Sequence, residues 1–133
     1  VCVEDIENLR RTVADAYDVM IEEDELTGFI ADIGPYYVQF AKSNALAHLG
    51  QDGTIMMEAV HNVYLGDEHK IDSDQEANIM SLGFELAEDD MGPINWRKWG
   101  EIDNCREELI DSTVSAFDKV YHVVPGNLKI TFV

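Results

Sequence analysis

The sequence predicts an α+β domain in which helices pack on an antiparallel sheet, in the order helix, three strands, helix, strand, helix. Three observations support this prediction. Apolar residues recur at helical spacing in three separate segments, other segments alternate between apolar and polar side chains, and Gly, Pro and Asp mark the boundaries between them. The 133 residues fit one domain, residues 1–133, which is long enough to bury a core.

The first helix is predicted over residues 3–20. Its apolar residues recur every three or four positions and form one stripe, made of Ile6, Leu9, Val13, Ala16, Tyr17 and Met20. Glu4 and Asp5 suit the positive end of the helix dipole, whereas the acidic run at 22–25 is the wrong charge for the other end. The helix should therefore stop at that run.

The central sheet is predicted within residues 36–65, which have the densest β-branched and aromatic content of the chain. A short strand at 26–33 and an alternating strand after Gly34-Pro35 form a hairpin from Phe29 to Phe40. Residues 42–53 could form a loop, but their turn signal favours strand, turn, strand. A further strand at 54–65, apolar on both faces, follows this turn, although a helix over the same residues remains an alternative.

The second helix is predicted to begin at Ser73, because Ser73 and Glu76 fit a capping box. Its apolar spacing continues to Leu86, and an acidic stretch with Gly and Pro then ends it. Residues 94–99 alternate as a short strand.

The third helix is predicted to be capped by Asp103 or Asn104 and to continue to Val124, before Pro125-Gly126. Residues 128–133 alternate again, as a C-terminal strand or an extended tail.

The strongest compositional signal is the charge. The chain has 27 acidic and 9 basic residues, a formal net charge of -18 and a pI near 4.2. The electrostatic field of so acidic a protein repels nucleic acid and anionic membrane surfaces, so neither partner is expected. A basic protein partner would be attracted, but acidity that only maintains solubility explains the composition equally well.

The expected compartment is the cytoplasm. No apolar run approaches the roughly 20 residues of a membrane helix, and the first residues resemble no secretory signal. Cys2 and Cys105 are far apart in the sequence and are expected to be free thiols.

No catalytic residue, cofactor or metal is expected. Glu58 and His61 have the Glu-x-x-His spacing of di-iron helices, but such sites need two of these motifs, and a strand places the two side chains on opposite faces. The acidic residues at 72–76 fit a helix cap better than a calcium loop. Cys105 lacks a histidine at any spacing that would mark a catalytic pair.

Trp96 and Trp99 are the largest apolar side chains of a segment that also contains Arg97 and Lys98. An exposed Trp beside basic residues would suit a protein interface, because Trp and Arg are enriched at binding hot spots. Burial of both indoles is at least as expected.

Four segments together resemble a known superfamily: residues 37–41 (YVQFA), 58–65 (EAVHNVYL), 82–84 (LGF) and 93–96 (PINW). Their order and spacing are similar to those of actinobacterial proteins related to YbjN and the type III secretion chaperones (TY-Chap type). The resemblance extends from about residue 3 to residue 128. Phe84 and Trp96 differ from the Trp and Phe expected there, but both exchanges keep an aromatic ring.

The resemblance implies the type III secretion chaperone-like fold and a non-enzymatic protein that holds a partner polypeptide. Such chaperones are often dimeric, so a homodimer is also expected. We expect Trp96, Trp99, Tyr37 and Tyr64 to contact the partner. The alternative is an immunity protein whose acidic surface neutralises a cognate toxin.

Overall fold

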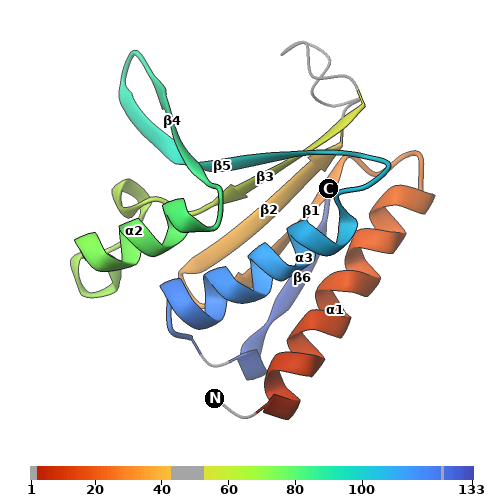
Figure 1. Cartoon of the computed structure of the whole chain (residues 1–133), viewed down its shortest axis with the longest axis horizontal. Helices are drawn as coiled ribbons and strands as arrows, with labels where there is room; N and C mark the ends of the chain where they lie inside the picture. Colours follow the sequence, from red (N-terminus) through yellow and green to blue (C-terminus); the bar gives the residue numbers. More distant parts are fainter. Residues whose placement is uncertain (1–2, 43–52, 124) are drawn as a thin grey trace.

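The computed structural model describes residues 3–42, 53–123 and 125–133 (Figure 1). These residues form three α-helices, six strands and several short helical turns. The α-helices are α1 (Val3–Glu22), α2 (Ser73–Ser81) and α3 (Arg106–Ser115). The strands are β1 (Gly28–Ile33), β2 (Tyr36–Lys42), β3 (Thr54–Ala59), β4 (Glu85–Asp89), β5 (Gly92–Glu101) and β6 (Lys129–Phe132).

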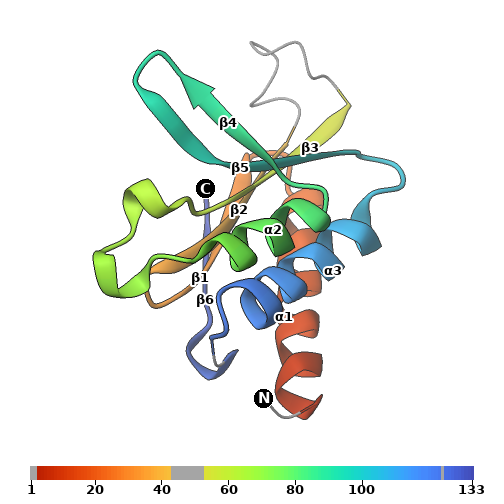
Figure 2. The ribbon, with the colours of Figure 1, turned by 60° about the vertical axis from the view of Figure 1, so that its left-hand side comes forward.

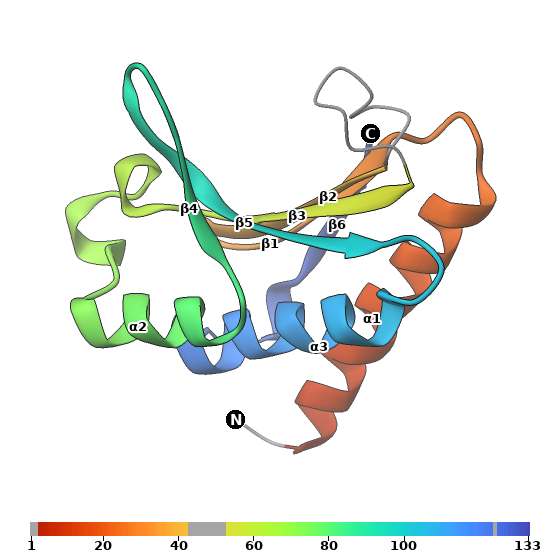
Figure 3. The ribbon, with the colours of Figure 1, turned by 45° about the horizontal axis from the view of Figure 1, so that its top comes forward.

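The six strands form one sheet in the order β4-β5-β3-β2-β1-β6, with every neighbouring pair antiparallel. The three helices lie on one face of this sheet, and within the described residues no helix covers the other face (Figure 3). The predicted α+β class, with helices packed on an antiparallel sheet, is confirmed. Among the described residues, no helix combines the length and apolarity needed to cross a membrane.

The predicted hairpin of β1 and β2 is present. Phe29 lies opposite Phe40 in the register, and their rings stack with centroids 4.6 Å apart. Gly34 has φ +61° in the connecting turn, a left-handed conformation that favours glycine. The terminal residues form β6, which extends the sheet beyond β1, so the strand alternative for this segment is confirmed.

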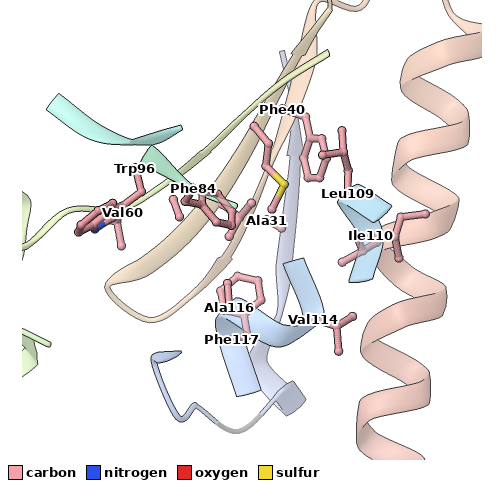
Figure 4. Close-up of a cluster of buried hydrophobic side chains, with 14 of the residues drawn as sticks. Ala31, Phe40, Val60, Phe84, Trp96, Leu109, Ile110, Val114, Ala116 and Phe117 are labelled. Atoms are coloured by element: carbon pink, nitrogen blue, oxygen red, sulfur yellow. The ribbon is translucent and has the colours of Figure 1, made fainter. Parts of the chain in front are cut away.

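The core lies between the sheet and the helices. Figure 4 shows side chains of the strands and of the α3 region pointing into one cluster. The predicted apolar stripe of α1 joins it, since Leu9, Val13 and Met20 are buried. Burial of this kind contributes about 25 cal/mol for each Å² of apolar surface removed from water, and it holds the helices on one face of the sheet.

The second helix is shorter than predicted. It ends at Ser81, because Gly83 turns the chain with φ +95°, and the residues that follow form β4 rather than a continued helix. Leu86, expected on the helical stripe, pairs with Trp96 of β5 instead. The capping box also lies one residue earlier: Asp72 Oδ1 accepts from the Gln75 N–H, and Gln75 Oε1 accepts from the Asp72 N–H.

The strand predicted at 54–65 ends at Ala59. A 3-10 turn, η2 (Asn62–Tyr64), follows it, and His61 Nδ1 accepts the Val63 N–H at its start. The Asn62 amide bonds both the N–H and the C=O of Ile71, at 2.8 and 2.9 Å. The helical alternative is therefore wrong for 54–59. The structure predicted for 42–53 falls mostly at 43–52, outside the described residues.

The third helix begins at Arg106, later than predicted, with Cys105 at its N-cap. Asp103 and Asn104 belong to a turn in which the N–H groups of Asn104 and Cys105 both donate to the Glu101 carbonyl. After Ser115 the helix continues as a π-helical segment, η4 (Ala116–Val120). The last helical residue is therefore Val120, rather than Val124.

The free energy of unfolding should fall at alkaline pH because the phenol of Tyr121 is buried. This phenol is buried and donates to the Val60 carbonyl at 2.8 Å, and its pKa is raised by burial and by the neighbouring Tyr37 and Tyr36. Burial likewise raises the pKa of Tyr17. The unfolded chain loses these protons near pH 10 while the folded chain keeps them, so the stability present below about pH 10 is lost as the pH rises.

Chemical unfolding between about pH 8 and pH 12 measures this effect, which has a limit of about 1.4 kcal/mol per pH unit for one tyrosine. The variant Tyr121→Phe should show a shallower decline above about pH 10, by up to that slope. It should also be less stable by about 1 kcal/mol at neutral pH, because it lacks the hydrogen bond. Equal alkaline slopes in the two proteins would contradict the assignment.

Candidate protein-binding surface

The open face is the face of the sheet opposite the helices. Because side chains alternate along a strand, the residues between the buried core positions point to this face. The cross-strand registers place them in rows. One row consists of Ile30, Gln39, Glu58, Arg97 and Glu85. The adjacent row consists of Gly28, Ala41, Met56 and Trp99.

The centre of the open face is an ordered polar cluster around Glu58. Its carboxylate accepts a hydrogen bond from Gln39 Nε2 at 3.0 Å and from Arg97 Nε at 3.1 Å. The Glu58 side chain is only 6% exposed, so both partners are needed to offset its desolvation. This carboxylate is thus engaged by its neighbours on the sheet.

His61 has a different structural role from Glu58. It lies beyond the end of β3, and its Nδ1 caps η2. Among the described residues, no three His, Cys, Asp or Glu side chains cluster in a way that could hold a metal ion.

Trp99 is the aromatic side chain that the open face presents to solvent. It is 37% exposed and lies opposite Met56. Trp99 lines a depression of about 530 Å³ beside Gly83 and Glu108 and a second of about 250 Å³ along β4. A third, of about 220 Å³, is lined by Met56 and its neighbours on β1 and β2. Trp99 therefore lines two of these three depressions.

Trp96, in contrast to Trp99, is not exposed on the surface. It is 3% exposed, and its indole lies in the core cluster of Figure 4. Its ring is 5.7 Å from that of His61, and its Nε1 has no hydrogen-bond acceptor among the described residues. The expectation that Trp96 contacts a partner is therefore corrected: of the two tryptophans, only Trp99 is available.

Tyr37 lies on the open face, two residues before Gln39 on β2, whereas Tyr64 lies on η2. Tyr37 is half-buried, and its hydroxyl donates to Asn95 Oδ1 at 3.3 Å. Its pKa is raised mainly by burial and also by the charges of Glu58 and Tyr64, which outweigh the opposite effect of Asn95. Tyr64 is 57% exposed on η2. Tyr64 is thus free to contact another molecule, whereas the Tyr37 hydroxyl is already engaged.

The hairpin of β4 and β5 is the feature that the sequence did not reveal. It leaves the sheet and projects on the side away from the helices (Figures 2 and 3). Its outer residues are acidic: Glu85, Glu88, Asp89 and Asp90. Among the described residues none of these four forms an ion pair; Asp89 accepts the Met91 N–H in the turn. Met91, at the tip, is 96% exposed.

Most basic side chains are engaged within the molecule. Lys42 and Lys98 are buried, with the Lys42 ammonium donating to the carbonyls of Met20 and Glu23 at the end of α1. Lys98 Nζ donates to the Leu82 carbonyl and to Ser112 Oγ and pairs with Glu108. The other ion pairs of Lys and Arg are Arg10–Asp111, Lys70–Asp67, Arg97–Glu58, Arg106–Asp18 and Arg106–Glu107.

Cys105 is a buried free thiol that contacts the Tyr17 hydroxyl at 3.5 Å. It also fills the space beside Gly100, where an added Cβ would come within 2.4 Å of the Cys105 Cβ. This packing accounts for the position of Cys105. Cys2 lies outside the described residues.

The open face thus carries the exposed Trp99, an apolar row beside it and a polar cluster around Glu58. The acidic residues of the adjoining hairpin form no ion pair within the residues that the structure describes. Comparisons with protein-family models, with curated proteins and with solved structures found no significant match.

Proposed function

We propose that this chain is a non-enzymatic, cytoplasmic protein-binding module, similar to secretion chaperones or adaptors, which holds a partner polypeptide on the open face of its sheet. The observation that supports this proposal best is the half-exposed Trp99, which lines two depressions. Exposed aromatics in hollowed surfaces are typical of protein-binding hot spots. The resemblance of residues 37–41 and 58–65 to the YbjN and secretion-chaperone superfamily supports the same class of function.

Co-expression with the product of each adjacent gene tests this proposal. We expect at least one polypeptide to co-purify in a fixed ratio, and we expect Trp99→Ala to weaken the complex. The variant Met80→Ala is the matched control, because Met80 is an exposed apolar residue on α2, away from the open face. If no polypeptide co-purifies and the adjacent genes all encode metabolic enzymes, the proposal fails.

A second candidate function is an immunity protein that neutralises a toxin. The observation that favours it is the acidic hairpin, whose carboxylates form no ion pair within the described part of the chain and would complement a basic enzyme such as a nuclease. Protection of cells that express the adjacent gene would support this candidate. An adjacent gene that is harmless without this protein would count against it.

A further inference from the structure

We propose that the surface around Trp99 and the β4–β5 hairpin binds a basic, amphipathic segment of the partner, with apolar side chains on the floor and Lys or Arg on the wall. The floor consists of Ala41, Met56 and Trp99. The wall consists of Glu85 and Glu88 of β4, which line one depression with Trp99. This inference rests on the proposed function and adds to it the surface and the chemistry of the partner.

The floor is suited to apolar side chains. Ala41, Met56 and Trp99 are consecutive across three strands, and the depression beside Met56 is lined mainly by apolar surface. Covering this row would remove the exposed part of Trp99 from water, which is favourable in proportion to the apolar area buried.

The wall is suited to cations. The hairpin projects from the sheet on the side away from the helices (Figure 3). At its base Glu85 lies opposite Arg97, in the row next to that of Trp99. Within the described part of the chain, neither Arg97 nor Lys98 forms an ion pair with Glu85 or Glu88. The Arg97 guanidinium is bonded to Glu58, and the Lys98 ammonium is buried among Leu82, Ser112 and Glu108.

Glu85 and Glu88 also line the depression beside Trp99 together with Arg97. An indole next to unpaired carboxylates attracts a cationic side chain both by charge and by the face of the ring. The same arrangement disfavours an acidic or purely apolar segment, because either would leave the carboxylates without a partner.

Calorimetry with two synthetic peptides tests this inference. The peptides share their apolar residues, and their polar positions are either Lys and Arg or Gln. In about 0.15 M salt, where the Debye length is about 8 Å, the basic peptide should bind and the Gln peptide should bind about tenfold more weakly or not at all. Trp99→Ala should weaken the basic peptide about tenfold, with Trp99→Phe intermediate.

A matched pair of charge variants separates a local site from the general acidic field. The hairpin variant E85Q/E88Q and the control variant E23Q/E25Q remove the same charge, and the control residues are exposed after α1. We expect the hairpin variant to lose about tenfold in affinity and the control less than about twofold. Equal losses in the two variants, or an unchanged affinity of Trp99→Ala, would overturn the inference.

The outcome also separates this inference from the proposed function. If a polypeptide co-purifies with the chain but the basic peptide does not bind at Trp99, this surface and partner chemistry are wrong and the proposed function stands. If no polypeptide co-purifies and the adjacent genes all encode metabolic enzymes, the proposed function fails whatever the peptides do.

Discussion

Replacing Phe117 with alanine is expected to lower the free energy of unfolding by about 3–5 kcal/mol. Phe117 is fully buried in the π-helical segment η4, and its ring lies in the cluster between the sheet and the helices (Figure 4). The variant would lose the transfer free energy of the ring and leave a cavity that the rigid sheet cannot fill.

Urea unfolding followed by circular dichroism measures this change. The control is Met91→Ala at the exposed hairpin tip, which should change the free energy of unfolding by less than about 0.5 kcal/mol. A Phe117→Ala protein as stable as the control would mean that η4 does not close the core.

Replacing Arg97 with methionine is expected to cost about 2–3 kcal/mol of stability. The Glu58 carboxylate would remain buried on the open face with only the Gln39 amide as its partner. The double variant Glu58→Gln/Arg97→Met should recover most of the loss, because a neutral amide is less costly to bury than an unpaired carboxylate.

The matched control for this pair is Lys70→Met. Lys70 also pairs with a carboxylate, that of Asp67, but both side chains are exposed, so its loss should cost less than about 0.5 kcal/mol. If Arg97→Met and Lys70→Met lowered the free energy of unfolding by equally small amounts, the Glu58 cluster would contribute no more to stability than a surface ion pair.

The sequence was sufficient for the elements whose local pattern agrees with their place in the fold. The stripe of α1 has one period and faces one core. Alternation in residues 36–41 and the Gly34 turn fix both the strand and its register with β1. These elements could be predicted because propensity, pattern and burial favour the same structure.

The segment after α2 could not be predicted in the same way. Leu82 and Leu86 are four residues apart, so they fit a helix, and nothing local shows that Gly83 adopts a left-handed φ. Leu86 pairs with Trp96 across the β4–β5 hairpin. This tertiary contact outweighs the helical preference that the spacing of Leu82 and Leu86 indicates. The acidic hairpin, and with it half of the candidate site, was therefore not foreseen.

The two tryptophans illustrate how far the candidate site could be predicted. Alternation places Trp96 and Trp99 on opposite faces of a strand, which the structure confirms, but it does not tell which face the helices cover. In the structure the helices lie on one side of the sheet (Figure 3), and Trp96 is buried whereas Trp99 is exposed.

Amide hydrogen exchange, measured for the chain alone and in complex with the polypeptide that co-purifies, tests the central claim most directly. Binding on the open face predicts slower exchange in residues 85–101 and 37–41, with α1 unchanged. Slower exchange confined to α1 and α3, with residues 85–101 unaffected, would contradict it, because the partner would then lie on the helical side of the molecule.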